Sequence, residues 1–126
     1  MTASSAKKAR SSAASGRPTR LLRPSTTTCR RRLPGAELLL LSNGRRFSDP
    51  AFAAAFAAAA RPPFTLGVSI HGPTPAEHDR VAGVKGAFAE TMLGLKNLLA
   101  LPSAPALELR VILHKLNYRR LGAILG

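Results

Sequence analysis

Three short apolar runs, bounded by turn residues and separated by helical patterns, constrain the fold of this chain most strongly. Apolar runs of about four to eight residues between turn signals favour strands that are buried on both faces, as in a parallel sheet. The runs are residues 38–41 (LLLL), 64–70 (FTLGVSI) and 107–113 (LELRVIL). We therefore predict three strands in these ranges.

Helical patterns follow each predicted strand. Residues 51–60 (AFAAAFAAAA) are strong helix formers, and residues 48–50 (SDP) before them suit an N-cap and a first helical position. Residues 74–77 (TPAE) have capping-box spacing, and the apolar spacing of residues 88–99 is typical of a helix. Residues 118–125 resemble the first turns of a further helix. The predicted order is β-α-β-α-β-α.

An alternating order of strands and helices is typical of a parallel sheet with right-handed crossovers. Ligands of such sheets bind at the carboxyl ends of the strands, which are here residues 42–44, 69–72 and 114–117. A complete (β/α)₈ barrel takes about 250 residues, whereas about 90 residues here supply three strands. We therefore expect an α/β fold, a partial (β/α) barrel slice of three parallel βα units with exposed sheet edges.

Residues 1–35 differ from the rest of the chain in charge. They hold nine Lys and Arg residues and no acid, out of 19 basic and six acidic residues in the whole sequence. Prolines interrupt them, and no helical or strand period is sustained. We therefore predict a disordered basic tail over residues 1–35 and a folded βα domain over residues 36–126.

Three interpretations of this basic tail stay open. Clustered arginines bind phosphates, but no aromatic residue accompanies them, so binding to nucleic acid would be weak and independent of sequence. An Arg- and Ser-rich segment without acids also fits an organelle-targeting peptide. The third interpretation is a solvated extension without a function of its own.

Residue types exclude several kinds of site. Cys29 is the only cysteine, which excludes a disulfide framework and a four-cysteine zinc site. The histidines, His71, His78 and His114, form no HExxH pattern, so we predict polar loop residues bonded to backbone and assign no metal ligand. Neither a GxSxG elbow nor a glycine-rich phosphate loop occurs. No apolar run reaches about 18 residues, so we predict no membrane-spanning helix. We also expect a cytoplasmic location and no membrane partner.

Residues 69–88, SIHGPTPAEHDRVAGVKGAF, carry a resemblance to a known superfamily. They resemble the stretch of radical S-adenosylmethionine (radical SAM) enzymes that runs from the end of the fourth strand, through a His-Asp pair, into the next helix. Residues 42–44 (SNG) resemble the end of that family's third strand, and residues 116–121 (LNYRRL) its loop after the fifth strand. The resemblance covers residues 37–126, the central part of the domain. It implies an enzyme that reductively cleaves S-adenosylmethionine with a [4Fe–4S] cluster.

The resemblance also implies a set of cofactor-binding residues. Ser42 and Ser69 match strand-end positions that contact the methionine part or the ribose of S-adenosylmethionine, and Asn43 belongs to the same strand ending as Ser42. Arg110 falls near a position where some members direct a basic residue toward the cofactor carboxylate. His71 is also assigned to cofactor binding, but it stands where many peptide-modifying members have Asp, so their acid–base role is not transferred to it. These hydroxyls and this cation would face a common pocket that suits a zwitterionic amino acid.

One departure from the family bears on activity. Radical SAM enzymes hold their cluster with a CxxxCxxC loop after the first strand, and this chain has a single cysteine. Strands one and two of the family's domain have no counterpart, and the basic tail stands in their place. We therefore expect an incomplete radical SAM domain without activity of its own, unless another chain supplies the missing strands and cysteines. The alternative is a small basic protein whose tail binds nucleic acid or an acidic partner.

Overall fold

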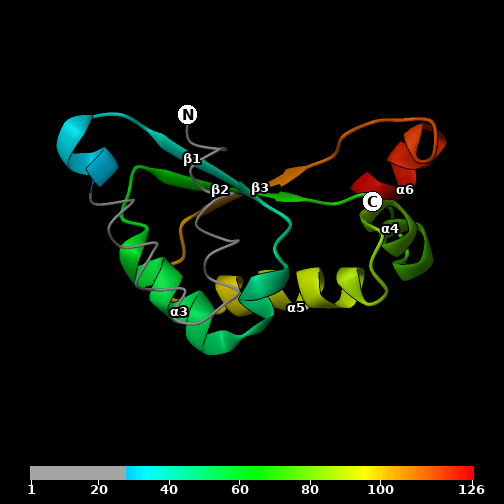
Figure 1. Ribbon diagram of the computed structural model, residues 1–126, viewed down its shortest axis with the longest axis horizontal. Coiled ribbons are helices and arrows are strands. Elements are labelled where there is room, and N and C mark those ends of the chain that lie inside the picture. The colour runs from blue at the N-terminus through cyan, green and yellow to red at the C-terminus, as the bar shows by residue number, and fades with distance from the viewer. Residues whose placement is uncertain (1–27) are drawn as a thin grey trace.

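The computed structural model describes residues 28–126, and its centre is a three-stranded parallel sheet (Figure 1). The strands, in their order across the sheet, are β1 (Leu38–Ser42), β2 (Phe64–Ser69) and β3 (Ala106–Arg110). In the register, Leu38 lies opposite Phe64, and Thr65 lies opposite Ala106. The predicted α/β class and the parallel arrangement of three strands are confirmed.

Helical segments follow each strand. In chain order they are η1 (Arg45–Ser48), α3 (Pro50–Ala59), α4 (Pro75–Ala82), α5 (Ala87–Leu99), η2 (Tyr118–Arg120) and α6 (Leu121–Leu125), where η marks a 3-10 helix. Two predicted caps are confirmed, since the Asp49 carboxylate accepts from Ala51 N and the Thr74 hydroxyl accepts from Glu77 N. No helix within residues 28–126 is long and apolar enough to cross a bilayer.

Side chains of the sheet alternate between its two faces, and α3 and α5 lie along one of them (Figure 1). On that face Leu66 and Val68 of β2 belong to one buried cluster with Phe56 of α3 and Leu98 of α5. Leu66, Val68 and Leu98 are fully excluded from solvent. Burial of each such side chain stabilises the fold by roughly 1.5–3 kcal/mol, so this layer holds the sheet and the helices together.

The other face of the sheet is left bare by these helices (Figure 1). By the register, Leu41, Gly67 and Glu108 lie side by side on it. A Cβ atom added at Gly67 would lie 2.6 Å from Leu41 Cδ2 and 3.4 Å from Arg110 Cγ. The side chains of Leu41 and Arg110 therefore meet over Gly67 and partly close this face.

The third strand is shorter than predicted. The apolar run of residues 107–113 predicts a strand to Leu113, but the pairing with β2 ends at Arg110. Beyond Arg110 the side chain of Asn117 donates to Ile112 O and accepts from His114 N, which turns the chain into a loop. Apolar residues alone do not mark this end, because a polar side chain takes over the backbone groups. The helix predicted for residues 118–125 also differs, since it begins as the 3-10 turn η2.

The N-terminal boundary of the domain also differs from the prediction. Residues 1–27 of the predicted tail lie outside the described residues, whereas residues 28–32 form a helical turn. The guanidinium of Arg30 donates to three backbone carbonyls, those of Ala36 (3.1 Å), Pro63 (2.6 Å) and Arg61. These carbonyls precede β1 and β2 and match the several donors of one guanidinium. For residues 28–32 the prediction of disorder is therefore wrong.

Gly94 brings α5 against the loop that follows β1. A Cβ atom at Gly94 would lie 2.5 Å from Gly44 O and 3.0 Å from Phe47 Cβ, so a larger residue would have to displace backbone. Gly44 has φ 77°, and its own Cβ would lie 2.8 Å from Val68 Cγ1. Both sides of this contact therefore require glycine.

We expect Gly94→Ala to destabilise the fold by about 1–3 kcal/mol, because the added methyl group overpacks a contact with backbone. Gly122→Ala in α6 is the matched control, since no atom lies within 4 Å of a Cβ added there and alanine has the better helix propensity. Urea unfolding of both variants measures the difference. Equal midpoints for the two variants would contradict the tight contact.

Candidate functional site at the carboxyl ends of the strands

The loop after β1 is shaped by its own polar side chains. The hydroxyl of Ser42 accepts from Gly44 N (3.1 Å), and Asn43 Oδ1 accepts from Arg45 N (3.1 Å). Bonds of this short range turn a chain sharply. Ser42 is buried and lies opposite Val68 in the register, so its side chain faces the helices.

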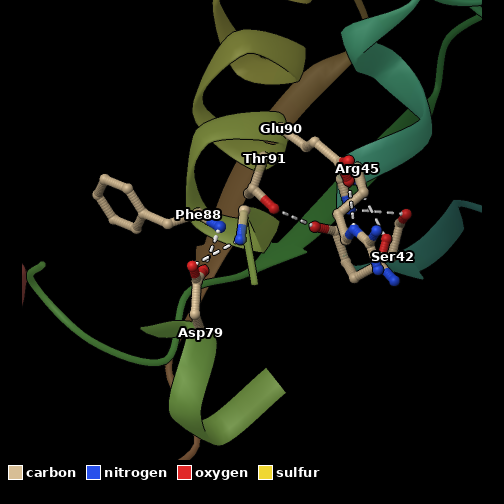
Figure 2. A network of polar contacts seen from close by, with 9 residues as sticks. Ser42, Arg45, Asp79, Phe88, Glu90 and Thr91 are labelled. Carbon is tan, nitrogen blue, oxygen red and sulfur yellow. Dashed lines mark hydrogen bonds and ion pairs between the residues drawn. The ribbon is translucent and has the colours of Figure 1, made fainter. Parts of the chain in front are cut away.

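Helix α5 holds this loop in place (Figure 2). The hydroxyl of Thr91, which is fully buried, donates to Asn43 O (2.8 Å). Arg45 Nε lies 2.5 Å from Glu90 Oε2 in a partly exposed ion pair, a kind that contributes about 0–1 kcal/mol. Because the Thr91 bond is shielded from water and the ion pair is not, Thr91 fixes the loop more firmly.

Asp79 of α4 caps the N-terminus of α5 (Figure 2). Its carboxylate accepts from Phe88 N (2.8 Å) and Gly86 N (2.7 Å), which are amides that the helix itself leaves unpaired. These two hydrogen bonds lower the pKa of Asp79, because they stabilise its charged form. Next to it, the buried His78 accepts from His71 N through Nδ1 (3.1 Å). The His-Asp pair thus links the end of β2 to the start of α5.

Strands β2 and β3 end side by side with polar residues on the bare face. Ser69 and Arg110 are register partners, and Ile70 N donates to Arg110 O (2.9 Å) to close the ladder. The guanidinium of Arg110 forms an ion pair of 2.7 Å with Glu108 Oε1, and both side chains are nearly half-exposed. A hydroxyl and a cation therefore stand next to each other at neighbouring strand ends.

Asn117 joins the two loops that follow β2 and β3. Its side chain is buried, donates to His71 O (3.2 Å) and to Ile112 O (3.0 Å), and accepts from His114 N (2.9 Å). The amide donors and the carbonyl of this asparagine are thus all engaged by backbone. Since one side chain reaches both loops, the backbones of His71 and His114 are held beside each other.

Three buried nitrogens in this region have no hydrogen-bond partner within residues 28–126: His71 Nδ1, Arg110 Nε and His114 Nε2. Glu108 lies close to Arg110 Nε but is not aligned to accept from it, so the pair is ionic only. Each unsatisfied buried polar group costs about 1–3 kcal/mol. Three of them at adjacent strand ends therefore mark this region as a candidate ligand site.

The pKa values of His71 and His78 are set mainly by burial. Burial lowers the pKa of His71, and the positive charge that His114 can carry lowers it further. Burial likewise lowers the pKa of His78, with a smaller contribution from His71. Both rings are therefore neutral near pH 7 and offer a lone pair or an N–H rather than a charge.

The five residues assigned to cofactor binding separate into two groups. Ser69, His71 and Arg110 lie at the adjoining ends of β2 and β3, and their role in binding stays a prediction. Ser42 and Asn43 instead form the turn after β1. Ser42 pairs with Val68, the residue before Ser69, so the two serines face opposite sides of the sheet. The expectation that both serines face a common pocket is therefore wrong.

The histidines follow the sequence-based prediction in part. His78 accepts from His71 N and His114 accepts from Leu116 N, as predicted for polar loop residues bonded to backbone. The Nδ1 atom of His71 makes no such bond. The sequence-based prediction included Asn117 in the strand-end range 114–117 but gave it no role, although a polar residue three positions after a strand-end histidine is a spacing at which side chains commonly bond to backbone.

The chain matches no family model, no curated protein and no solved structure. Within the part of the chain that the structure describes, no group of three or more His, Cys, Asp or Glu side chains is placed to hold a metal ion. Cys29, the one thiol of the sequence, packs against the hydrophobic cluster. A [4Fe–4S] cluster is held by several cysteine thiolates, so the residues present do not fit one.

The Asp79 cap makes the stability of the fold depend on pH. Because its pKa is lower in the folded state, its contribution is present above the unfolded pKa and is lost as pH falls through the folded pKa. We expect Asp79→Asn to be less stable than the natural chain at neutral pH, and the two stabilities to converge in acid. Urea unfolding between about pH 7 and pH 3 measures this.

Glu37→Gln is the control for this titration, since it removes one carboxylate at an exposed position before β1. Its stability should run parallel to that of the natural chain. A constant offset between Asp79→Asn and the natural chain over the whole range would show that the charge of Asp79 does not matter.

Proposed function

We propose that residues 36–126 are the central part of a radical SAM-type domain, and that the ends of β2 and β3 bind the amino-acid part of S-adenosylmethionine. The supporting observation is the position of Ser69 and Arg110, register partners at the carboxyl ends of parallel strands on the face that α3 and α5 do not cover. In a (β/α) barrel this face is the interior, and ligands bind at this end of it. The resemblance carried by residues 69–88 points to the same end of the same strand.

The polar groups at this edge suit a zwitterion. A guanidinium such as that of Arg110 pairs with a carboxylate, and the hydroxyl of Ser69 and the neutral ring of His71 can accept from an ammonium group. Glu108 already lies 2.7 Å from Arg110 Nε, so an incoming carboxylate has to compete with it. We therefore expect weak binding.

The proposed activity of this chain is binding rather than radical chemistry. S-Adenosylmethionine supplies a radical only when a reduced cluster delivers an electron to it, and one cysteine does not hold such a cluster. A second chain that brings the missing strands and thiolates would restore the chemistry. Among residues 28–126, β1 and β3 each have one neighbour in the sheet, so such strands would pair with the outer edges of β1 and β3. We place this partnership in the cytoplasm.

Equilibrium dialysis of the full chain against labelled S-adenosylmethionine tests the proposal. We expect Arg110→Gln to weaken binding by about tenfold, because a charged hydrogen bond to the carboxylate is lost. Arg61→Gln makes the same change in charge at the amino end of the sheet and should leave binding unchanged. Absence of binding by the natural chain, or equal losses in both variants, would refute the proposal.

A second candidate function is the binding of nucleic acid or an acidic partner through the basic N-terminal segment. The observation that favours it is the charge of residues 1–35, nine basic residues without an acid. Arg30 is already bonded to backbone carbonyls, so the other basic residues of the segment would make the contacts. Binding of this kind depends on counterion release rather than on a shaped site.

Deletion of residues 1–27 tests this second candidate, because it removes six basic residues and keeps the Arg30 anchor. We expect the affinity for single-stranded DNA to fall, and its dependence on salt to become shallower. Fluorescence anisotropy at about 50 and 200 mM salt measures both. The control is S-adenosylmethionine binding, which the deletion should leave intact. Full retention of DNA affinity after the deletion would exclude this function.

A further inference from the structure

The ring of His114 is held in one tautomer by its own loop. Leu116 N donates to His114 Nδ1 (3.2 Å), so this nitrogen carries the lone pair. In a neutral imidazole the other nitrogen then carries the proton, which places it on Nε2. Nε2 is also the atom that is buried without a partner. The unsatisfied atom of His114 is therefore a hydrogen-bond donor.

This tautomer excludes other uses of the ring. A nitrogen that carries a proton has no lone pair for a metal ion, so Nε2 is not a metal ligand in this state. Protonation of the ring would place a second N–H on Nδ1, directly against the N–H of Leu116. The group that His114 lacks is therefore a hydrogen-bond acceptor.

The charges around His114 favour an anionic acceptor. Residues 110–126 contain three Arg and one Lys and no acid. Two of these arginines already have carboxylate partners, since Arg120 pairs with Glu77 (2.8 Å) and Arg110 lies beside Glu108. Of the two remaining charges, Lys115 belongs to the same loop as the unsatisfied N–H, the one that Asn117 holds against the end of β2, and Arg119 lies in the adjoining η2.

We propose that His114 Nε2–H donates a hydrogen bond to an anionic oxygen, of a carboxylate or a phosphate, on a ligand bound at the ends of β2 and β3. The assignment rests on the proposed function in placing the ligand at this edge. It adds His114 as a residue that determines which ligands bind. An N–H donor with a fixed direction disfavours a cation, or a group that can only donate hydrogen bonds, because neither can accept from it. His114 acts by positioning the ligand, and no proton is transferred.

Nitrogen-15 NMR of histidine in the full chain provides the first test. We expect the neutral form of the His114 ring to carry its proton on Nε2 and none on Nδ1. Addition of inorganic phosphate or acetate at constant ionic strength should shift the Nε2 signal until it saturates. The anion that binds more tightly identifies the source of the oxygen, and chloride is the reference. A proton on Nδ1, or no saturable shift with either anion, would overturn the assignment.

Variants at residue 114 provide the second test. His114→Gln retains a side-chain N–H donor and should bind the anion within about threefold of the natural chain, whereas His114→Ala should lose about tenfold or more. Lys115→Gln removes a neighbouring charge but no buried donor. Its loss of anion affinity should be smaller than that of His114→Ala, and at high salt it should bind the anion as the natural chain does. If His114→Ala does not fold, the anion affinity of His114→Gln relative to the natural chain still tests the role of the donor, and a loss of much more than about threefold would refute it. Equal affinities of the alanine and glutamine variants would refute the role of the donor.

The experiments distinguish failure of the proposed function from failure of the role of His114. Binding of S-adenosylmethionine without an anion-dependent shift at His114 would refute the role of His114 alone. A saturable shift at His114 in a chain that does not bind S-adenosylmethionine would refute the proposed function and support an anion site with another ligand.

Discussion

The packing of α5 against the loop after β1 is the contact on which the rest of the structure depends. Gly94 places the helix against Gly44 O, and Thr91 donates to the carbonyl of the residue before it. Asn97, further along the same helix, donates to Phe47 O and Ser48 O. One helix thus satisfies three carbonyls of the segment that connects β1 to α3. Because this segment is fixed, α3 and α5 stay on one face of the sheet and leave the other face uncovered.

The fold could be predicted from the sequence to a large extent because its signals are local. Apolar runs bounded by turns gave the three strands, and Asp49 and Thr74 gave the starts of α3 and α4. The misplaced boundaries arise from contacts between distant residues. β3 ends early because Asn117 binds the backbone beyond it, and residues 28–32 are ordered because Arg30 reaches carbonyls about 30 residues away. Neither contact leaves a periodic pattern in the sequence.

The candidate site could be predicted less well, because it depends on register. The sequence placed the ends of β1 and β2 to within one residue and the end of β3 three residues too late, and it did not reveal that Ser42 pairs with the residue before Ser69. A shift of one position reverses the face of every side chain in a strand. The unsatisfied Nε2 of His114 is also invisible in the sequence, since it follows from a bond between Leu116 N and the opposite side of the same ring.

The anchoring of Arg30 separates the two proposed activities in space. Arg30 binds the carbonyls of Ala36 and Pro63, which come just before β1 and β2, at the amino end of the sheet. Ser69, Arg110 and His114 lie at the other end of the strands or just beyond it. A polyanion that contacts residues close to Arg30 would thus approach the pole of the molecule remote from the ligand edge. The two proposals therefore assign their ligands to opposite ends of the strands, so neither proposed ligand needs the residues that the other one uses.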